Sequence, residues 1–315
     1  MLNNLFFSIN IALPIFLLMI TGKMLINKDI LTKTFVKNSN TFVFYIGLPI
    51  KLCTDMLNTS FDQAISMKFI SYVLIGILVG SIFSYGMGCI LIKDKTKVGT
   101  FTQGAFRGNF LYVGYSLLEN IFPAVPAFVP IMVAFTMPMY NILSIIYLIL
   151  CQGEKINKAT LKNMIVSIIK NPLVIAIFIG LVLNMLHFKL PIALERYTGY
   201  IKQLVTPLAL VTIGATFNFE KVNANTAMAL VATFIKLVLI PAVAVVVGYA
   251  IDLNTEELLV SYVFFGVPTA ASSYIIAISM KGDGELASNI IMYTTLLSIF
   301  TITGFIFIFK FIGWI

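Results

Sequence analysis

The chain has 315 residues, of which 59% are hydrophobic and only 11% carry a charge. A soluble domain carries charge on roughly a quarter of its residues, so this composition excludes an ordinary soluble protein and favours a helical membrane protein. The net charge of +8 does not predict a nucleic-acid partner, because lysines at the cytoplasmic ends of membrane helices make most such proteins basic.

Apolar runs of about 20 residues recur along the whole chain, and each is long enough to cross ~30 Å of hydrocarbon. They predict an all-α polytopic membrane protein with ten transmembrane helices in the lipid bilayer. The first run lacks a preceding basic region and a small-residue cleavage site, so we expect a membrane span there and not a signal peptide. The spans are predicted at residues 5–26, 35–57, 67–92, 101–120, 124–150, 161–187, 197–219, 226–250, 258–280 and 286–312.

The distribution of lysine along the chain predicts its orientation. Lysines gather in the first, third and fifth connections, whereas the second, fourth and eighth have almost none. Lys189 and Arg196 in the sixth connection depart from this pattern. Because positive charge marks the cytoplasmic side, we expect both termini to lie outside a cell (inner) membrane.

The two halves of the chain repeat each other at a constant offset of 158 residues. Each half holds five spans, an odd number, so the second half has to insert with the opposite orientation. We therefore expect two inverted repeats, residues 1–157 and 158–315, which is the plan of many secondary transporters. The matching pairs are Pro14 and Pro172, Gly22 and Gly180, Pro49 and Pro207, Asp94 and Asp252, and Gly108 and Gly266.

Two of the predicted spans, 101–120 and 258–280, contain residues that interrupt a helix. Polar residues stand beside these interruptions, and a polar broken helix is tolerated in a membrane only where it lines a cavity inside the protein. We therefore expect the two breaks to meet and to form the substrate site. The predicted helix breakers are Gly108 and Gly114 in the first span and Gly266 and Pro268 in the second.

The chemistry of a broken helix favours an anion. The half-helix that starts inside the membrane presents free N–H groups and roughly +0.5 of a charge. An asparagine can add a neutral donor, and threonine and serine can add hydroxyls. The alternative is that these small residues only allow close helix packing. The residues expected to hold the substrate are Gly108, Asn109, Pro268, Thr269 and Ser272, with Ser273 as a further candidate.

Three charged positions leave alternatives open. Arg107 could attract the anion, or it could extend to the cytoplasm or cap a carbonyl. Lys51 and Asp55, four residues apart in span 35–57, could pair on one helix face, either as an interfacial ion pair or as a gating or coupling element. Glu119 is expected to be solvated at the outer end of span 101–120.

Segments spread over nearly the whole chain resemble those of a known family. In order and spacing they are similar to the auxin efflux carrier family, which includes the plant auxin carriers and bacterial malate- and malonate-permease-like proteins. The segments are NTFVFYIGLP at 40–49, Arg107-Gly108-Asn109 followed by Gly114, PMYNILS at 138–144, Asn171-Pro172-Leu173, PLALVTIGAT at 207–216, and PTAASSYIIA at 268–277 followed by Gly282-Asp283.

The resemblance implies an architecture similar to that of bile-acid symporters and sodium–proton antiporters. Spans 1, 2, 6 and 7 would form a scaffold, which is usually the contact of a homodimer. Spans 3–5 and 8–10 would form a transport unit that moves like an elevator, with spans 4 and 9 crossing at its centre. The asparagine and the proline at the family's crossing match Asn109 and Pro268.

The chain also departs from the plant carriers. It lacks their proline shortly after the crossing asparagine, where we expect Gly114 to supply the flexibility, and Thr269 stands in place of an asparagine. No acidic–lysine pair occurs between Ser71 and Ile92, and the long cytoplasmic loop is absent. Auxin itself is therefore not the expected substrate.

Together these observations predict a secondary carrier of small organic anions, mono- or dicarboxylates such as malate, that needs no cofactor or metal. A proton gradient, a sodium gradient and the membrane potential are all open as driving forces. The alternative is a sodium-coupled symporter of the bile-acid type, for which Gln103 and Asn109 are the candidate sodium ligands in span 4. An enzyme is not expected, because the sequence has one histidine and neither an HExxH nor a GxSxG motif.

Overall fold

The computed structural model describes residues 2–58, 67–126, 128–152, 162, 166, 169–216 and 225–315. These residues form helices, and the β-structure among them is one isolated bridge. In the first half the elements are α1 (Leu2–Asn27), α2 (Lys33–Phe42), η1 (Val43–Gly47), α3 (Leu48–Leu57), α4 (Met67–Leu91), α5 (Lys95–Phe106), η2 (Phe110–Gly114), α6 (Tyr115–Ile121) and α7 (Phe128–Cys151), where η denotes a π-helix. In the second half they are α9 (Pro172–Met185), α10 (Ile192–Ala215), α11 (Thr226–Phe234), η3 (Ile235–Leu239), α12 (Ile240–Ala250), α13 (Thr255–Gly266), α14 (Ser272–Ser279) and α15 (Gly284–Phe311).

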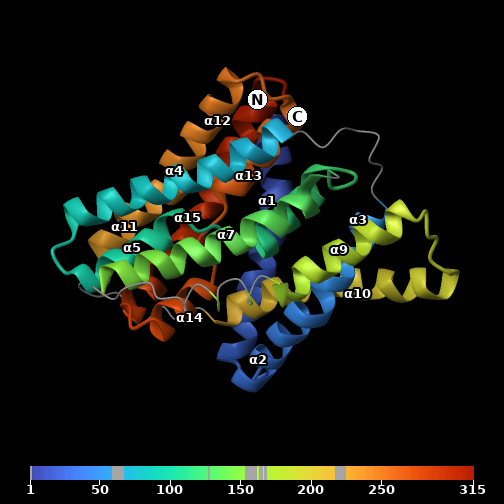
Figure 1. Cartoon of the computed structure of the whole chain (residues 1–315), viewed down its shortest axis with the longest axis horizontal. Coiled ribbons are helices and arrows are strands. Elements are labelled where there is room, and N and C mark those ends of the chain that lie inside the picture. Colours follow the sequence, from blue (N-terminus) through green and yellow to red (C-terminus); the bar gives the residue numbers. More distant parts are fainter. Residues whose placement is uncertain are drawn as a thin grey trace.

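The helices gather in two groups. Figure 1 shows α2, α3, α9 and α10 together at the lower right, and α4, α5, α7, α11, α12 and α15 at the upper left. The long helix α1 packs against α10 on one side and against α15 on the other, and so joins the groups.

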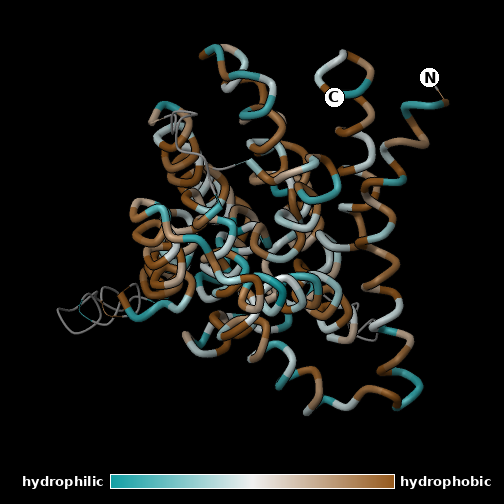
Figure 2. The backbone as a smooth tube through the Cα atoms, turned by 90° about the vertical axis from the view of Figure 1, so that its right-hand side faces the viewer, coloured by the Kyte–Doolittle hydropathy of each residue, from teal (hydrophilic) through white to brown (hydrophobic). Residues whose placement is uncertain are grey.

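The outer surface of the molecule is apolar. Hydrophobic residues follow most of the helices in Figure 2, and large side chains such as Ile75, Phe178, Val246 and Phe300 are more than half exposed. Within the described ranges, five helical stretches are long and apolar enough to cross a membrane. A soluble monomer rarely exposes apolar surface on this scale, so the structure is that of an integral membrane protein.

Two helical stretches contain a π-helix followed by a proline. η1 ends two residues before Pro49, and η3 ends two residues before Pro241. Proline removes a backbone donor and its ring crowds the preceding turn. The wider π turn accommodates this local change without ending the helix.

Glycines allow a close contact that occurs twice. A Cβ on Gly22 of α1 would fall on the Val211 carbonyl of α10, and a Cβ on Gly180 of α9 would fall within 2.5 Å of the Cys53 carbonyl of α3. Gly180 follows Gly22 by 158 residues, and Val211 follows Cys53 by the same number. The packing of α1 on α10 therefore repeats the packing of α9 on α3, at the offset predicted from the sequence.

The helices α5 and α13 do not start at positions that match at the offset of 158. α5 begins after Asp94, whose carboxylate accepts hydrogen bonds from the backbone N–H and the hydroxyl of Thr96 at 3.0 and 2.7 Å. These bonds hold the pKa of Asp94 below its ordinary value. α13 begins after Asn254, which forms a capping box with Glu257, and not after Asp252. The start of α5 at Lys95 therefore corresponds to the start of α13 at Thr255, at an offset of 160 and not 158. The capping residues Asp94 and Asn254 fix these starts.

Candidate functional site

The two helix breaks lie against each other. Gly108 and Thr269 form an antiparallel bridge. The Asn109 N–H donates to the Pro268 carbonyl at 2.7 Å, and the Ala270 N–H donates to the Arg107 carbonyl at 3.3 Å. A buried backbone group without a partner costs about 1–3 kcal/mol, and here each break supplies partners for the other. We call residues 107–109 and 267–271 the crossing.

The helices α5 and α13 end at the crossing, and a side chain from outside each helix caps its last turn. The Thr269 hydroxyl donates to the Gly104 carbonyl near the end of α5 at 2.6 Å. The Lys236 ammonium donates to the Phe265 carbonyl near the end of α13 at 2.5 Å. The last carbonyls of a helix have no partner within it, so these contacts stabilise the break. The Thr269 hydroxyl, expected at the substrate, is thus engaged with the protein.

Asn109 keeps its side chain available. Only 5% of the residue is exposed, and its carbonyl accepts hydrogen bonds from the N–H groups of Val113 and Gly114 at 3.0 and 3.2 Å. Its side-chain amide makes no hydrogen bond to the described residues. A buried amide of this kind can donate to an anion without adding a buried charge.

Arg107 is buried and does not extend to the surface. One guanidinium nitrogen, Nη2, donates to Asn141 Oδ1 at 2.7 Å and to Ser272 Oγ at 3.0 Å. The other, Nη1, has no partner within the described part of the chain. The structure therefore joins Arg107 and Ser272, two of the predicted site residues, and adds Asn141 of α7 to them.

Further buried polar atoms near Arg107 lack partners among the described residues. They include Gln103 Oε1 and Ser273 Oγ, and the Gln103 amide nitrogen donates to the Ser273 carbonyl at 3.0 Å. Buried polar atoms in proteins are nearly always hydrogen-bonded, so such a group of atoms is a candidate position for a ligand or water. These atoms lie at the end of α5 and the start of α14.

Lys236 is the residue that the sequence analysis missed. It lies on η3, is fully buried, and its ammonium nitrogen would be 3.2 Å from a Cβ placed on Gly108. No carboxylate pairs with it among the described residues. A signal was present, since Lys236 is a single charge inside an apolar run, and such a residue in a membrane marks a functional site by default.

The predicted pair of Lys51 and Asp55 finds other partners in the structure. The Lys51 ammonium lies 2.6 Å from Glu119 on α6 and donates to Thr206 on α10 at 3.1 Å. The Thr206 hydroxyl in turn donates to Glu119 at 3.0 Å. Glu119 is exposed, as predicted, with 36% of its side chain accessible, and the structure adds its ion pair with Lys51.

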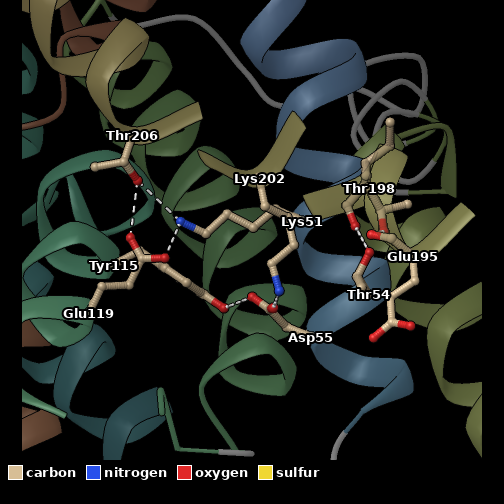
Figure 3. Close-up of polar contacts among 10 residues, drawn as sticks. Lys51, Thr54, Asp55, Tyr115, Glu119, Glu195, Thr198, Lys202 and Thr206 are labelled. Carbon is tan, nitrogen blue, oxygen red and sulfur yellow. Dashed lines mark hydrogen bonds and ion pairs between the residues drawn. The ribbon is translucent and has the colours of Figure 1, made fainter. Parts of the chain in front are cut away.

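Asp55 completes this network one turn further along α3 (Figure 3). It forms an ion pair with Lys202 on α10 at 2.5 Å, and it accepts a hydrogen bond from the Tyr115 hydroxyl on α6. The Lys51 ammonium also lies over the Tyr115 ring, 4.6 Å from its centre. The whole network thus holds α6, the helix that follows the crossing, against α3 and α10.

The outer helices are apolar and exposed, and they surround two broken helices with buried polar groups that lack partners among the described residues. Together these features define an integral membrane protein of the transporter class. The family described as "Membrane transport protein" matches residues 7–306, and the chain belongs to that family. This confirms the predicted membership among the auxin efflux carriers, and it identifies a transporter and not an enzyme.

Two relatives are similar over most of their length. The chain is 24% identical over 280 residues to "Uncharacterized transporter YfdV" of Escherichia coli (strain K12), with 86% of this chain and 88% of that protein covered. It is 27% identical over 290 residues to "Putative malonate transporter" of Rhizobium meliloti (strain 1021), with 86% of each covered.

Proposed function

We propose that this protein is a secondary carrier of small organic anions, such as the mono- and dicarboxylates malate and malonate, and that it binds them at the crossing. The observation that carries the proposal is Arg107 Nη1, a buried donor without a partner among the described residues, close to the Asn109 amide, which makes no capping hydrogen bond. A carboxylate accepts hydrogen bonds from such donors and is held most firmly by a charged one. The name of the Rhizobium meliloti relative agrees with this substrate class.

We further propose ten spans in two inverted repeats, residues 1–157 and 158–315, with both termini outside the cell membrane. The repeated glycine contact of α1 with α10 and of α9 with α3 supports this arrangement. In this proposal α1–α3, α9 and α10 form the scaffold and the contact of a homodimer. The other helices form the transport unit, which carries the crossing across the membrane in an elevator-like movement.

A sodium-coupled symporter is the second candidate. It is favoured by Gln103 Oε1 and Ser273 Oγ, two buried oxygens without partners in the described part of the chain. Hard cations prefer oxygen ligands of this kind. Transport that requires sodium would select this candidate, whereas equal rates with and without sodium would leave a proton gradient or the membrane potential as the driving force.

The proposal is tested by counterflow in proteoliposomes loaded with unlabelled malate or malonate. Labelled substrate should enter wild-type vesicles, and Asn109→Ala should slow this entry by about tenfold or more, the effect of losing a charge-assisted hydrogen bond. Asn3→Ala, at an exposed position on α1, is the matched control and should transport normally. If wild-type vesicles show no counterflow with either acid or with related carboxylates, the proposal is wrong.

A further inference from the structure

Lys236 is a buried cation that lacks a counter-ion in the described part of the chain. Its side chain is fully buried, its hydrogen bond is to the Phe265 carbonyl, and no carboxylate among the described residues pairs with it. Taking a charge out of water is unfavourable unless an opposite charge or several hydrogen bonds replace the water. An ammonium group has three donors, so one carbonyl leaves most of this requirement unmet.

Gly108 allows the Lys236 ammonium to approach the backbone of the crossing closely. A Cβ at this position would stand 3.2 Å from the Lys236 nitrogen and 3.1 Å from the Val267 side chain. With glycine there, the ammonium faces the backbone of the crossing directly. Lys236 therefore lies where an anion held by the crossing would meet it.

Arg107 is the second buried cation beside the crossing. It extends toward Asn141 and Ser272, and it has no ion pair with any described carboxylate. Two buried cations thus lie next to Gly108. Arg107 belongs to the crossing itself, and Lys236 comes from η3. A ligand with two negative charges would compensate both, whereas a single negative charge would leave one cation buried alone.

We propose that Lys236 binds the second carboxylate of a dianionic substrate and so makes the crossing selective for dicarboxylates over monocarboxylates. This inference rests on the proposed function, whose substrate class it narrows. The competing interpretation is that Lys236 only neutralises the carbonyl end of α13, as cations do at helix C-termini. The substitution Lys236→Gln separates the two, because glutamine still donates to the Phe265 carbonyl but carries no charge.

The experiment compares malonate with malonamate, its half-amide, which has nearly the same size and one charge fewer. Binding of each to the purified carrier in detergent is measured by calorimetry. The wild type should bind malonate about tenfold or more tightly than malonamate, as expected for one charge-assisted hydrogen bond. In Lys236→Gln this ratio should fall to about one, chiefly through weaker malonate binding. Lys68→Gln, at an exposed lysine of α4, should keep the wild-type ratio.

Two results would overturn the assignment: equal binding of both ligands by the wild type, or a glutamine variant that keeps the ratio. If Lys236→Gln does not fold, Lys236→Arg takes its place, and this variant should keep the preference for malonate because it keeps the charge. Loss of that preference in a folded arginine variant, with malonamate binding unchanged, would also contradict the charge role. If the wild type binds neither ligand and shows no counterflow, the proposed function itself falls.

Discussion

At the scale of single residues, Thr269 is the position where the contribution of the crossing to stability can be measured. Its hydroxyl supplies the partner of the Gly104 carbonyl, and both lie in the interior. Thr269→Val keeps the shape of the side chain and leaves that carbonyl unpaired, so we expect a loss of about 1–3 kcal/mol in the free energy of unfolding. Thermal and denaturant unfolding of the purified carrier measure this loss.

Thr269→Ser is the control for that substitution, because serine keeps the hydroxyl and removes only a methyl group. It should therefore lie much closer to wild type than valine does. If Thr269→Val is as stable as wild type, the hydrogen bond to the Gly104 carbonyl does not hold the end of α5.

At the scale of helices, the ion pair between α3 and α6 should respond differently to the loss of each partner. The Lys51 side chain is only 3% exposed, whereas that of Glu119 is 36% exposed. Glu119→Gln leaves a buried cation with a weaker partner and should cost about 1–3 kcal/mol of stability. Lys51→Met removes the buried charge, and Glu119 keeps the Thr206 hydroxyl and water, so its cost should be smaller. A larger loss in Lys51→Met would contradict this account.

The contact of α1 with α10 depends on the absence of side chains. A Cβ on Gly22 would fall on the Val211 carbonyl, and a Cβ on Gly214 would fall on the Met19 carbonyl. Because the obstacles are backbone atoms, Gly22→Ala and Gly214→Ala should force the helices apart and lower the unfolding temperature strongly. Gly86→Ala on α4, where a Cβ meets nothing within 4 Å, should leave it unchanged.

The sequence predicted the positions of the helices better than the contacts between them. Apolar runs and the breakers near Gly108 and Pro268 predicted where helices lie and where two of them break, since those features depend on local composition. The ion pair of Lys51 with Glu119 joins residues far apart in the chain, and local spacing cannot predict such a contact. Lys236 could have been noticed as a single charge in an apolar run, but its contact with Gly108 arises only when the second half packs on the first.

At the scale of the whole molecule, the proposed inverted repeat predicts which helix ends lie on each side of the membrane. α5 and α13 begin at Lys95 and Thr255, and they start corresponding broken spans in opposite halves. The connection before α5 is basic, whereas Asp252 and Glu256 make the connection at α13 acidic. From the proposed inversion and the charge rule we therefore expect the start of α5 in the cytoplasm and the start of α13 outside.

Cysteine labelling in intact cells tests this placement. Single cysteines are introduced as Lys95→Cys and Glu256→Cys, both at exposed positions, after Cys53, Cys89 and Cys151 are replaced by serine. A maleimide that cannot cross the membrane should label the cysteine at 256 in intact cells, and the one at 95 only after permeabilisation. Labelling of both from the same side would mean that the halves are not inverted. The proposed five spans in each half would then also be wrong, because an odd number of spans requires inversion.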